Sequence, residues 1–154
     1  MKTELLMQMD GLAQTKDYVF VLAATNLPWE LDHALLRRLE KRILVGLPCV
    51  GARAQILRTA LHDRASPDID FEGTAERMRM YSGSDVMQVA KEAAMRPLRR
   101  MVSDLESAVH KHSCMGPVTP DDVVAALSVV QSTTSMCEIK YKNFAIEYGS
   151  NASD

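Results

Sequence analysis

The chain has 154 residues, of which 47% are hydrophobic and 25% charged, and its net charge at pH 7 is −2. This balance is typical of a globular protein and excludes a disordered chain. It also excludes a strongly basic surface for nucleic acid or anionic lipid, and no apolar run is long enough to cross a membrane. The three cysteines are widely spaced, so we expect reduced thiols in a cytoplasmic protein.

The first fifty residues predict a helix followed by two strands. Residues 2–10 place apolar side chains at helical spacing, with Gly11 as a stop signal. The segment YVFVLAATN, 18–26, is almost continuously apolar, which is typical of a strand buried on both faces. RILVGLP, 42–48, predicts a second strand, and a short helix is expected between them at about 29–38.

From residue 51 onward the pattern is helical throughout. We predict helices in 52–63, in 67–78 after Asp70, in 82–109, in 118–130 and from about 135 to 148. Ser82 and Asp85 form an S-x-x-D capping box, and Thr119 caps the helix that starts with Pro120. Pro97 should kink its long helix or end the first half of it.

Two adjacent arginines stand out in ALLRRLEKRIL, residues 34–44. A straight helix from Trp29 to Arg42 would place Arg38 and Arg42 on its apolar stripe, where a permanently charged guanidinium needs a partner. We therefore expect the helix to stop near Leu36, so that Arg37 and Arg38 project from its end. The alternative is an ordinary helix C-terminus, where cations suit the dipole.

Several motifs in order resemble the AAA ATPases of the meiotic subgroup, which contains katanin and spastin. They are TELLMQMDGL, AATNLPWELDHALLRRLEKRILVGLP with its compact RRLEKR, and YSGSDVMQVAKEAAMRPLRR. Leu39 and the string EAAMRPLRR are similar to the katanin-like 2 branch. The resemblance implies an α/β fold cut to the C-terminal part of an AAA large subdomain at 1–50. A helical lid subdomain at 51–131 and a C-terminal helix and tail at 132–154 would follow.

The resemblance also implies roles for residues at the ends of the first strand and helix. Asn26 matches sensor 1, which orients the attacking water near the γ-phosphate; on its own it would be a turn asparagine. Arg37 and Arg38 match the arginine fingers, which reach the nucleotide of the next subunit, where they stabilise the transition state.

A second group of matching residues lies on the adenine side of the nucleotide. Gly83, Ser84 and Asp85 match the sensor 2 position near adenine and ribose, and the capping box is the alternative reading. Ile56 and Ala60 match positions that wall the adenine, and the alternative is that they belong to the core.

We expect no catalytic or metal-binding role for two further clusters. Arg96, Arg99 and Arg100 form a basic stretch, which Glu92 suggests is a solvated helix face with an i,i+4 pair. The run HKHSC at 110–114 lacks usual zinc spacing, so no metal site is expected.

Neither a phosphate-binding G-x-x-x-x-G-K-[ST] motif nor an apolar strand ending in paired acids occurs in these residues. The complete family protein uses ATP and Mg²⁺, whereas this chain alone should bind neither tightly and should not hydrolyse ATP. In the family's sheet the two strands found here are not neighbours. We therefore expect the strands in 1–50 either to leave exposed edges or to pair in a way that the family does not use, and we expect a better-ordered helical lobe.

The favoured function is that of the C-terminal portion of a katanin-like, microtubule-severing ATPase. Its expected partners are other AAA subunits in a hexamer and tubulin, with no nucleic acid and no membrane. The expected location is the cytoplasm and the microtubule cytoskeleton, including cilium, flagellum or spindle. The alternatives are a non-catalytic interaction module that docks on complete AAA subunits, and a truncated chain with no separate role.

Overall fold

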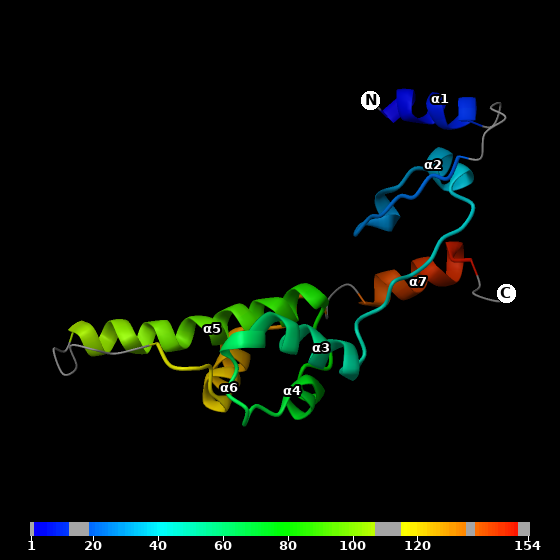
Figure 1. Ribbon diagram of the computed structural model, residues 1–154. Helices are drawn as coiled ribbons and strands as arrows, with labels where there is room; N and C mark the ends of the chain where they lie inside the picture. Colours follow the sequence, from blue (N-terminus) through cyan, green and yellow to red (C-terminus); the bar gives the residue numbers. More distant parts are fainter. Residues whose placement is uncertain (1, 13–18, 107–114, 135–137, 151–154) are drawn as a thin grey trace. The chain divides into compact units, whose positions relative to one another are not determined.

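The computed structural model describes residues 2–12, 19–106, 115–134 and 138–150, in which the named elements are all helices (Figure 1). The elements in chain order are α1 (Lys2–Leu12), η1 (Pro28–Glu30), α2 (His33–Arg38), α3 (Val50–Leu61), η2 (His62–Arg64), α4 (Phe71–Arg77), α5 (Gly83–Glu106), α6 (Pro120–Val129) and α7 (Glu138–Tyr148). The chain divides into two compact units. We call residues 46–136 the helical unit, and residues 1–45 with 137–154 the terminal unit.

The core of the helical unit forms where α3 packs on α4 and α5, and α5 packs on α6. Its buried members are Leu57, Leu61, Ile69, Met78, Val86, Val89, Ala90, Ala93, Val118, Val123, Ala126 and Val130. The members on α5 recur at helical spacing, so they form one apolar stripe along the helix. Burial of this stripe is what stabilises α5 against its neighbours.

Local signals define the ends of these helices as the sequence predicts. In the α5 capping box, the Ser82 amide donates to Asp85 Oδ2 over 2.9 Å and the Asp85 amide donates to Ser82 Oγ over 3.2 Å. Thr119 and Asp122 form the equivalent box at α6. Of the two outcomes predicted at Pro97, an end of the first half of α5 is wrong, because the helix runs unbroken from Gly83 to Glu106 (Figure 1), and a kink stays a prediction. Proline removes one backbone donor, and the turns on both sides remain helical.

The two predicted strands form no β-ladder in the described part of the chain. Residues 19–25 and 40–48 have neither helical nor ladder hydrogen bonding. The side chains of Phe20 and Val45 are 89% and 88% exposed, so these apolar segments have no partner sheet. A strand needs a neighbour for its backbone groups, and of the two predicted outcomes, exposed edges or an unusual pairing, the described residues show the first. The β-pairing among described residues is one parallel bridge between Ala65 and Val118.

The terminal unit has little core of its own. Among the described residues of this unit, Leu36 is the hydrophobic residue that is buried. Within this unit α1 contacts α2, and α7 contacts η1. Helix α1 ends at Leu12, one residue beyond the predicted stop at Gly11. None of the helices within the described residues is both long and apolar enough for a bilayer crossing.

Candidate functional site

Asn26 lies at a bend between the first apolar segment and η1, and its side chain is exposed. The following amide, that of Leu27, donates to Thr25 Oγ1 over 3.1 Å. The backbone carbonyl of Asn26 accepts a hydrogen bond of 2.6 Å from the Tyr141 hydroxyl of α7. The bend is therefore fixed through its backbone, which leaves the side-chain amide open to solvent.

Helix α2, which carries the arginine pair, is shorter than the predicted helix at about 29–38. Pro28 begins a single 3-10 turn, and Leu31 is then extended. Asp32 caps α2 by accepting from the Leu35 amide over 2.8 Å. An aspartate at this position starts a new helix instead of continuing the old one. As a result the arginines lie on a short helix that begins at His33.

The two arginines differ in what they contact. Arg37 is exposed and makes no hydrogen bond or ion pair with the described residues. Arg38 donates from Nε and Nη2 to the two carboxylate oxygens of Asp10, over 2.6 and 2.5 Å, and from Nη1 to the Ala34 carbonyl over 3.0 Å. The helix ends at Arg38 and not near Leu36, so the prediction of two projecting arginines holds for Arg37 and is wrong for Arg38.

The pair between Arg38 and Asp10 is open to water. The hydrogen bonds from Arg38 hold the pKa of Asp10 below its usual value, although both groups remain solvent-accessible. Exposed ion pairs of this kind add little net stability and are screened by salt. Arg38 is therefore easily released from Asp10 when a stronger anion is offered.

A third arginine, Arg42, is held by backbone carbonyls, although the sequence did not identify it as a site residue; its Nε is buried and has no hydrogen-bond partner among the described residues. Its Nη1 donates to the Tyr148 carbonyl over 2.7 Å, and its Nη2 donates to the Leu36 carbonyl. The backbone amide of Arg42 donates to Ser150 Oγ over 3.0 Å. The sequence indicated only that Arg42 would need a hydrogen-bond partner if it lay on the apolar stripe of a helix. In the structure its partners are backbone carbonyls at the ends of two helices.

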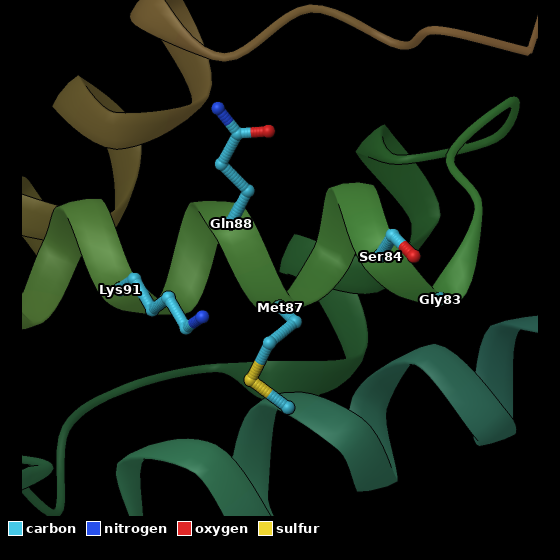
Figure 2. Close-up of a pocket in the computed structure, with 5 residues that line it drawn as sticks. All are labelled: Gly83, Ser84, Met87, Gln88 and Lys91. Atoms are coloured by element: carbon cyan, nitrogen blue, oxygen red, sulfur yellow. The ribbon is translucent and has the colours of Figure 1, made fainter.

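In the helical unit, Gly83 and Ser84 line a shallow surface groove with Met87, Gln88 and Lys91 (Figure 2). All five residues come from the first turns of α5. A Cβ at Gly83 would lie 3.8 Å from Ile56 Cδ1, so Ile56 supports the backbone at this point. The groove combines a hydroxyl, an amide and an ammonium group with the flexible thioether of Met87.

Asp85 is turned into the fold, away from this groove. Its side chain is buried, and besides the capping box it accepts a hydrogen bond of 2.9 Å from the Thr133 hydroxyl. Burial raises the pKa of Asp85, but the hydrogen bonds from Ser82 and Thr133 outweigh it and hold the pKa below its usual value. Asp85 therefore fixes both the start of α5 and the segment that follows α6.

Ile56 and Ala60, which were considered as adenine-walling residues, pack against the core of the helical unit. Neither is among the residues that line the groove. Their packing favours the alternative that they belong to the core, where they support α5 on its buried side.

The basic stretch of α5 is solvent-accessible, as the sequence suggested, because Arg99 and Arg100 are exposed and Arg96 is half-buried, but two of the three arginines also reach α6. The predicted pair between Glu92 and Arg96 is present at 3.6 Å, but Arg96 Nη2 also donates to the Ala125 carbonyl of α6 over 3.1 Å. Arg99 pairs with the same Glu92 over 2.5 and 3.1 Å.

Arg100 reaches α6 more directly. Both of its terminal nitrogens donate to Asp122, whose side chain is only 4% exposed. Burial raises the pKa of Asp122, but the bonds from Arg100 and Thr119 outweigh it, so the pKa lies below its usual value. Arg96 and Arg100 thus join α5 to α6.

The HKHSC run at 110–114, for which no metal site was expected, lies outside the described residues. Among the residues that the structure does describe, no group of three or more His, Cys, Asp or Glu side chains could hold a metal ion. Cys49 is exposed and is a free thiol.

Comparison with known proteins identifies the family. Residues 1–47 match the model of the ATPase family associated with various cellular activities (AAA), and residues 68–112 match the AAA+ lid domain. The chain contains the C-terminal part of an AAA module. This confirms the family and the fold class that the sequence motifs predicted.

The relatives are katanin-like. The A-like 2 form of the katanin p60 ATPase-containing subunit, from Xenopus tropicalis, is 43% identical over 97% of this chain and 30% of its own length. The A-like 1 form from Homo sapiens is 38% identical over 97% of this chain and 33% of its own. This AAA chain therefore spans about a third of the length of the curated relatives that it matches.

Solved structures agree with this assignment. The AAA domain of FIGL-1 in complex with ADP matches 96% of the chain and 51% of that domain, with a TM-score of 0.85 and 34% identity. A structure concerned with katanin self-assembly matches 94% of the chain and 52% of that chain, with a TM-score of 0.78 and 36% identity.

Proposed function

We propose that the chain acts in a katanin-like ATPase that severs microtubules, where it completes the nucleotide site of a neighbouring subunit. In this proposal Arg37 and Arg38 are the trans-acting arginines and Asn26 is the sensor of the γ-phosphate. The observation that carries the proposal is the state of Arg37. It is an exposed guanidinium with no partner among the described residues, at the end of a helix held by a cap and by buried Leu36.

The chemistry of phosphoryl transfer explains why such an arginine is useful. Negative charge on the transferred phosphoryl group is stabilised by a guanidinium that is always protonated and presents a rigid fork of donors. An arginine supplied in trans accelerates the reaction by roughly 10³–10⁵-fold. Arg37 is available for this task directly, and Arg38 becomes available when it exchanges the exposed carboxylate of Asp10 for a phosphate.

The groove of the helical unit is the candidate adenine-side contact. Gly83 and Ser84 present backbone and a hydroxyl at the start of α5, which has the partial positive charge of a helix N-terminus. Asp85 supports this turn from inside the fold, and Ile56 and Ala60 support it from the core. In this proposal ATP phosphates and Mg²⁺ are held elsewhere in the assembly, because the 154 residues include no G-x-x-x-x-G-K-[ST] sequence.

Names of relatives support the wider role. The solved katanin chain was studied for self-assembly, which supports other AAA subunits as partners, and we propose that they form a hexamer. Because the relatives are katanin-like, we propose tubulin as the substrate and the microtubule cytoskeleton of the cytoplasm as the location.

A mixing experiment tests the proposal. The chain is added to the complete katanin-like 2 protein of Xenopus tropicalis in which the arginine pair has been replaced by glutamine, and ATP hydrolysis is measured. We expect the wild-type chain to restore hydrolysis and the Arg37→Gln chain to fail. Lys41→Gln is the matched control, since Lys41 is an exposed cation nearby with no partner among the described residues. No restoration at saturating chain concentration contradicts the proposal.

A non-catalytic docking role is the second candidate, and the pair between Arg38 and Asp10 favours it, because one of the two arginines is engaged within its own unit. A second mixture, of the chain with the unmodified complete protein, distinguishes the two. If the chain is only a docking module, it should lower the hydrolysis rate of the unmodified complete protein, because it displaces active neighbours.

A further inference from the structure

One guanidinium group joins the C-terminal ends of two helices in the terminal unit. Arg42 donates to the Leu36 carbonyl in the last turn of α2 and, over 2.7 Å, to the Tyr148 carbonyl at the end of α7. The last carbonyls of any helix lack partners within it, and the helix dipole makes this end negative. A guanidinium group, which presents several donors in a fixed fork, is therefore suited to hold two such ends together.

The end of α7 is shaped to reach the segment that contains Arg42. The Gly149 amide donates to the Ala145 carbonyl over 2.9 Å, and a Cβ at Gly149 would lie 2.2 Å from that oxygen. Only glycine fits this close approach without displacing backbone. The turn brings Ser150 beside Arg42, where each backbone amide finds an acceptor on the other residue, over 3.0 and 3.1 Å.

The other end of α7 contacts the bend at Asn26. The Tyr141 hydroxyl donates to the Asn26 carbonyl, and the Tyr141 ring lies 5.1 Å from the Trp29 ring, centroid to centroid, at a tilt of 56°. Lys140 Nζ lies 5.5 Å from the centroid of the Trp29 ring. Helix α7 therefore contacts the bend of Asn26 directly and is joined to the helix of Arg37 through Arg42.

We propose that Arg42 is a positioning residue, which locks α7 onto the end of α2 so that the C-terminal helix sets the placement of Arg37. Helix α2 has only six residues, too few to be stable without tertiary contacts. Its pair with α1 through Arg38 is exposed and weak, so the contact through Arg42 dominates. The catalytic consequence of this proposal rests on the proposed function; the locking of α7 does not.

The first experiment measures the locking in the complete 154-residue chain. Trp29 is the only tryptophan, so its fluorescence reports the contact with α7. In Arg42→Gln we expect emission at longer wavelength and hydrogen exchange in α7 faster by about tenfold, the effect of losing a charge-assisted hydrogen bond. The matched control Lys41→Gln removes the same charge and should match wild type. Arg42→Lys, with one ammonium in place of a fork, should be intermediate.

Unfolding of the terminal unit would also change the Trp29 emission and the hydrogen exchange of α7. A second variant therefore distinguishes unfolding from the loss of the Arg42 contact. Tyr141→Phe keeps the ring beside Trp29 and loses only the bond to the Asn26 carbonyl, so α2 should stay locked while the bend loosens. If Arg42→Gln has the Trp29 emission and α7 exchange of wild type, or if Lys41→Gln changes them equally, the proposal is overturned.

The second experiment uses the mixture with the complete katanin-like 2 protein. Arg42→Gln should bind that protein with wild-type affinity but restore hydrolysis about tenfold less well, because small misplacements of a catalytic group can cost roughly 100-fold. A fall in affinity with an unchanged maximal rate would show a merely structural role and refute positioning. If wild type itself restores nothing, the proposed function fails, and the fluorescence and exchange results alone decide the locking by Arg42.

Discussion

Replacing Asp85 by alanine should destabilise the helical unit more than its place at a helix start alone suggests. The carboxylate receives the Ser82 amide and the Thr133 hydroxyl, each over 2.9 Å, and is buried. The Ser82 Oγ cap, which accepts from the backbone amide of residue 85, remains in the variant. The Ser82 amide, which is part-buried, loses its acceptor at a cost of roughly 1–3 kcal/mol. Because Thr133 is exposed and can turn to water, we expect about 1–3 kcal/mol in total.

Urea unfolding at pH 7, followed by circular dichroism, measures this loss. Asp121→Ala is the matched control, since Asp121 lies in the first turn of α6 and is exposed; it should cost less than about 1 kcal/mol. If Asp85→Ala is no more destabilising than Asp121→Ala, Asp85 does not hold the fold together as described.

The pH dependence supplies an independent check on Asp85. Its pKa is lower in the folded chain than the ordinary 3.8, so its ionised form stabilises the fold above that pH. This contribution is lost as the pH falls through the lowered value. The stability difference between wild type and Asp85→Asn should therefore be full at pH 7 and shrink below about pH 4. A difference that stays constant with pH would refute the reasoning.

Two further substitutions test the ion pairs. Arg100→Gln should lower the free energy of unfolding, measured in urea, by about 1–2 kcal/mol, because it leaves the buried carboxylate of Asp122 without its cation. The control Arg99→Gln, on the exposed face, should change the free energy of unfolding far less, and equal effects of the two substitutions would contradict the assignment. Asp10→Asn should release Arg38 and raise the restored hydrolysis in the mixture at low salt, with the gain fading at high salt; a lower rate would mean that Asp10 aligns Arg38 productively.

The helical unit was predictable because its signals are local. The capping boxes of Ser82 with Asp85 and of Thr119 with Asp122 are read from four consecutive residues, and both form in the structure. The apolar stripe of α5 needs only helical periodicity, which the structure follows. At Pro97 the predicted end of the helix does not occur, since a proline inside a well-packed helix need not end it.

The terminal unit was harder because its contacts are non-local. A strand is defined by its neighbour, so the apolar pattern around Phe20 and Val45 could predict extended backbone but not a ladder. Arg42 meets Tyr148, 106 positions away, and its acceptors are carbonyls that every residue carries. Nothing in the residue types marks such a contact, although the need for a partner at Arg42 was visible.

The engagement of Arg38 by Asp10 was missed for the same reason. The two residues are 28 positions apart, and an aspartate near the end of α1 looks like any surface acid. The exposed state of Arg37, by contrast, follows from its place in the last turn of a short helix.

The central claim is that Arg37 completes the nucleotide site of another protomer. The most direct measurement is the hydrolysis rate of the complete katanin-like 2 protein without its own arginine pair, titrated with the wild-type, Arg37→Gln and Lys41→Gln chains. We predict restoration by wild type and by Lys41→Gln, with a loss of roughly 10³-fold or more for Arg37→Gln at equal binding. Equal restoration by all three chains would contradict the account.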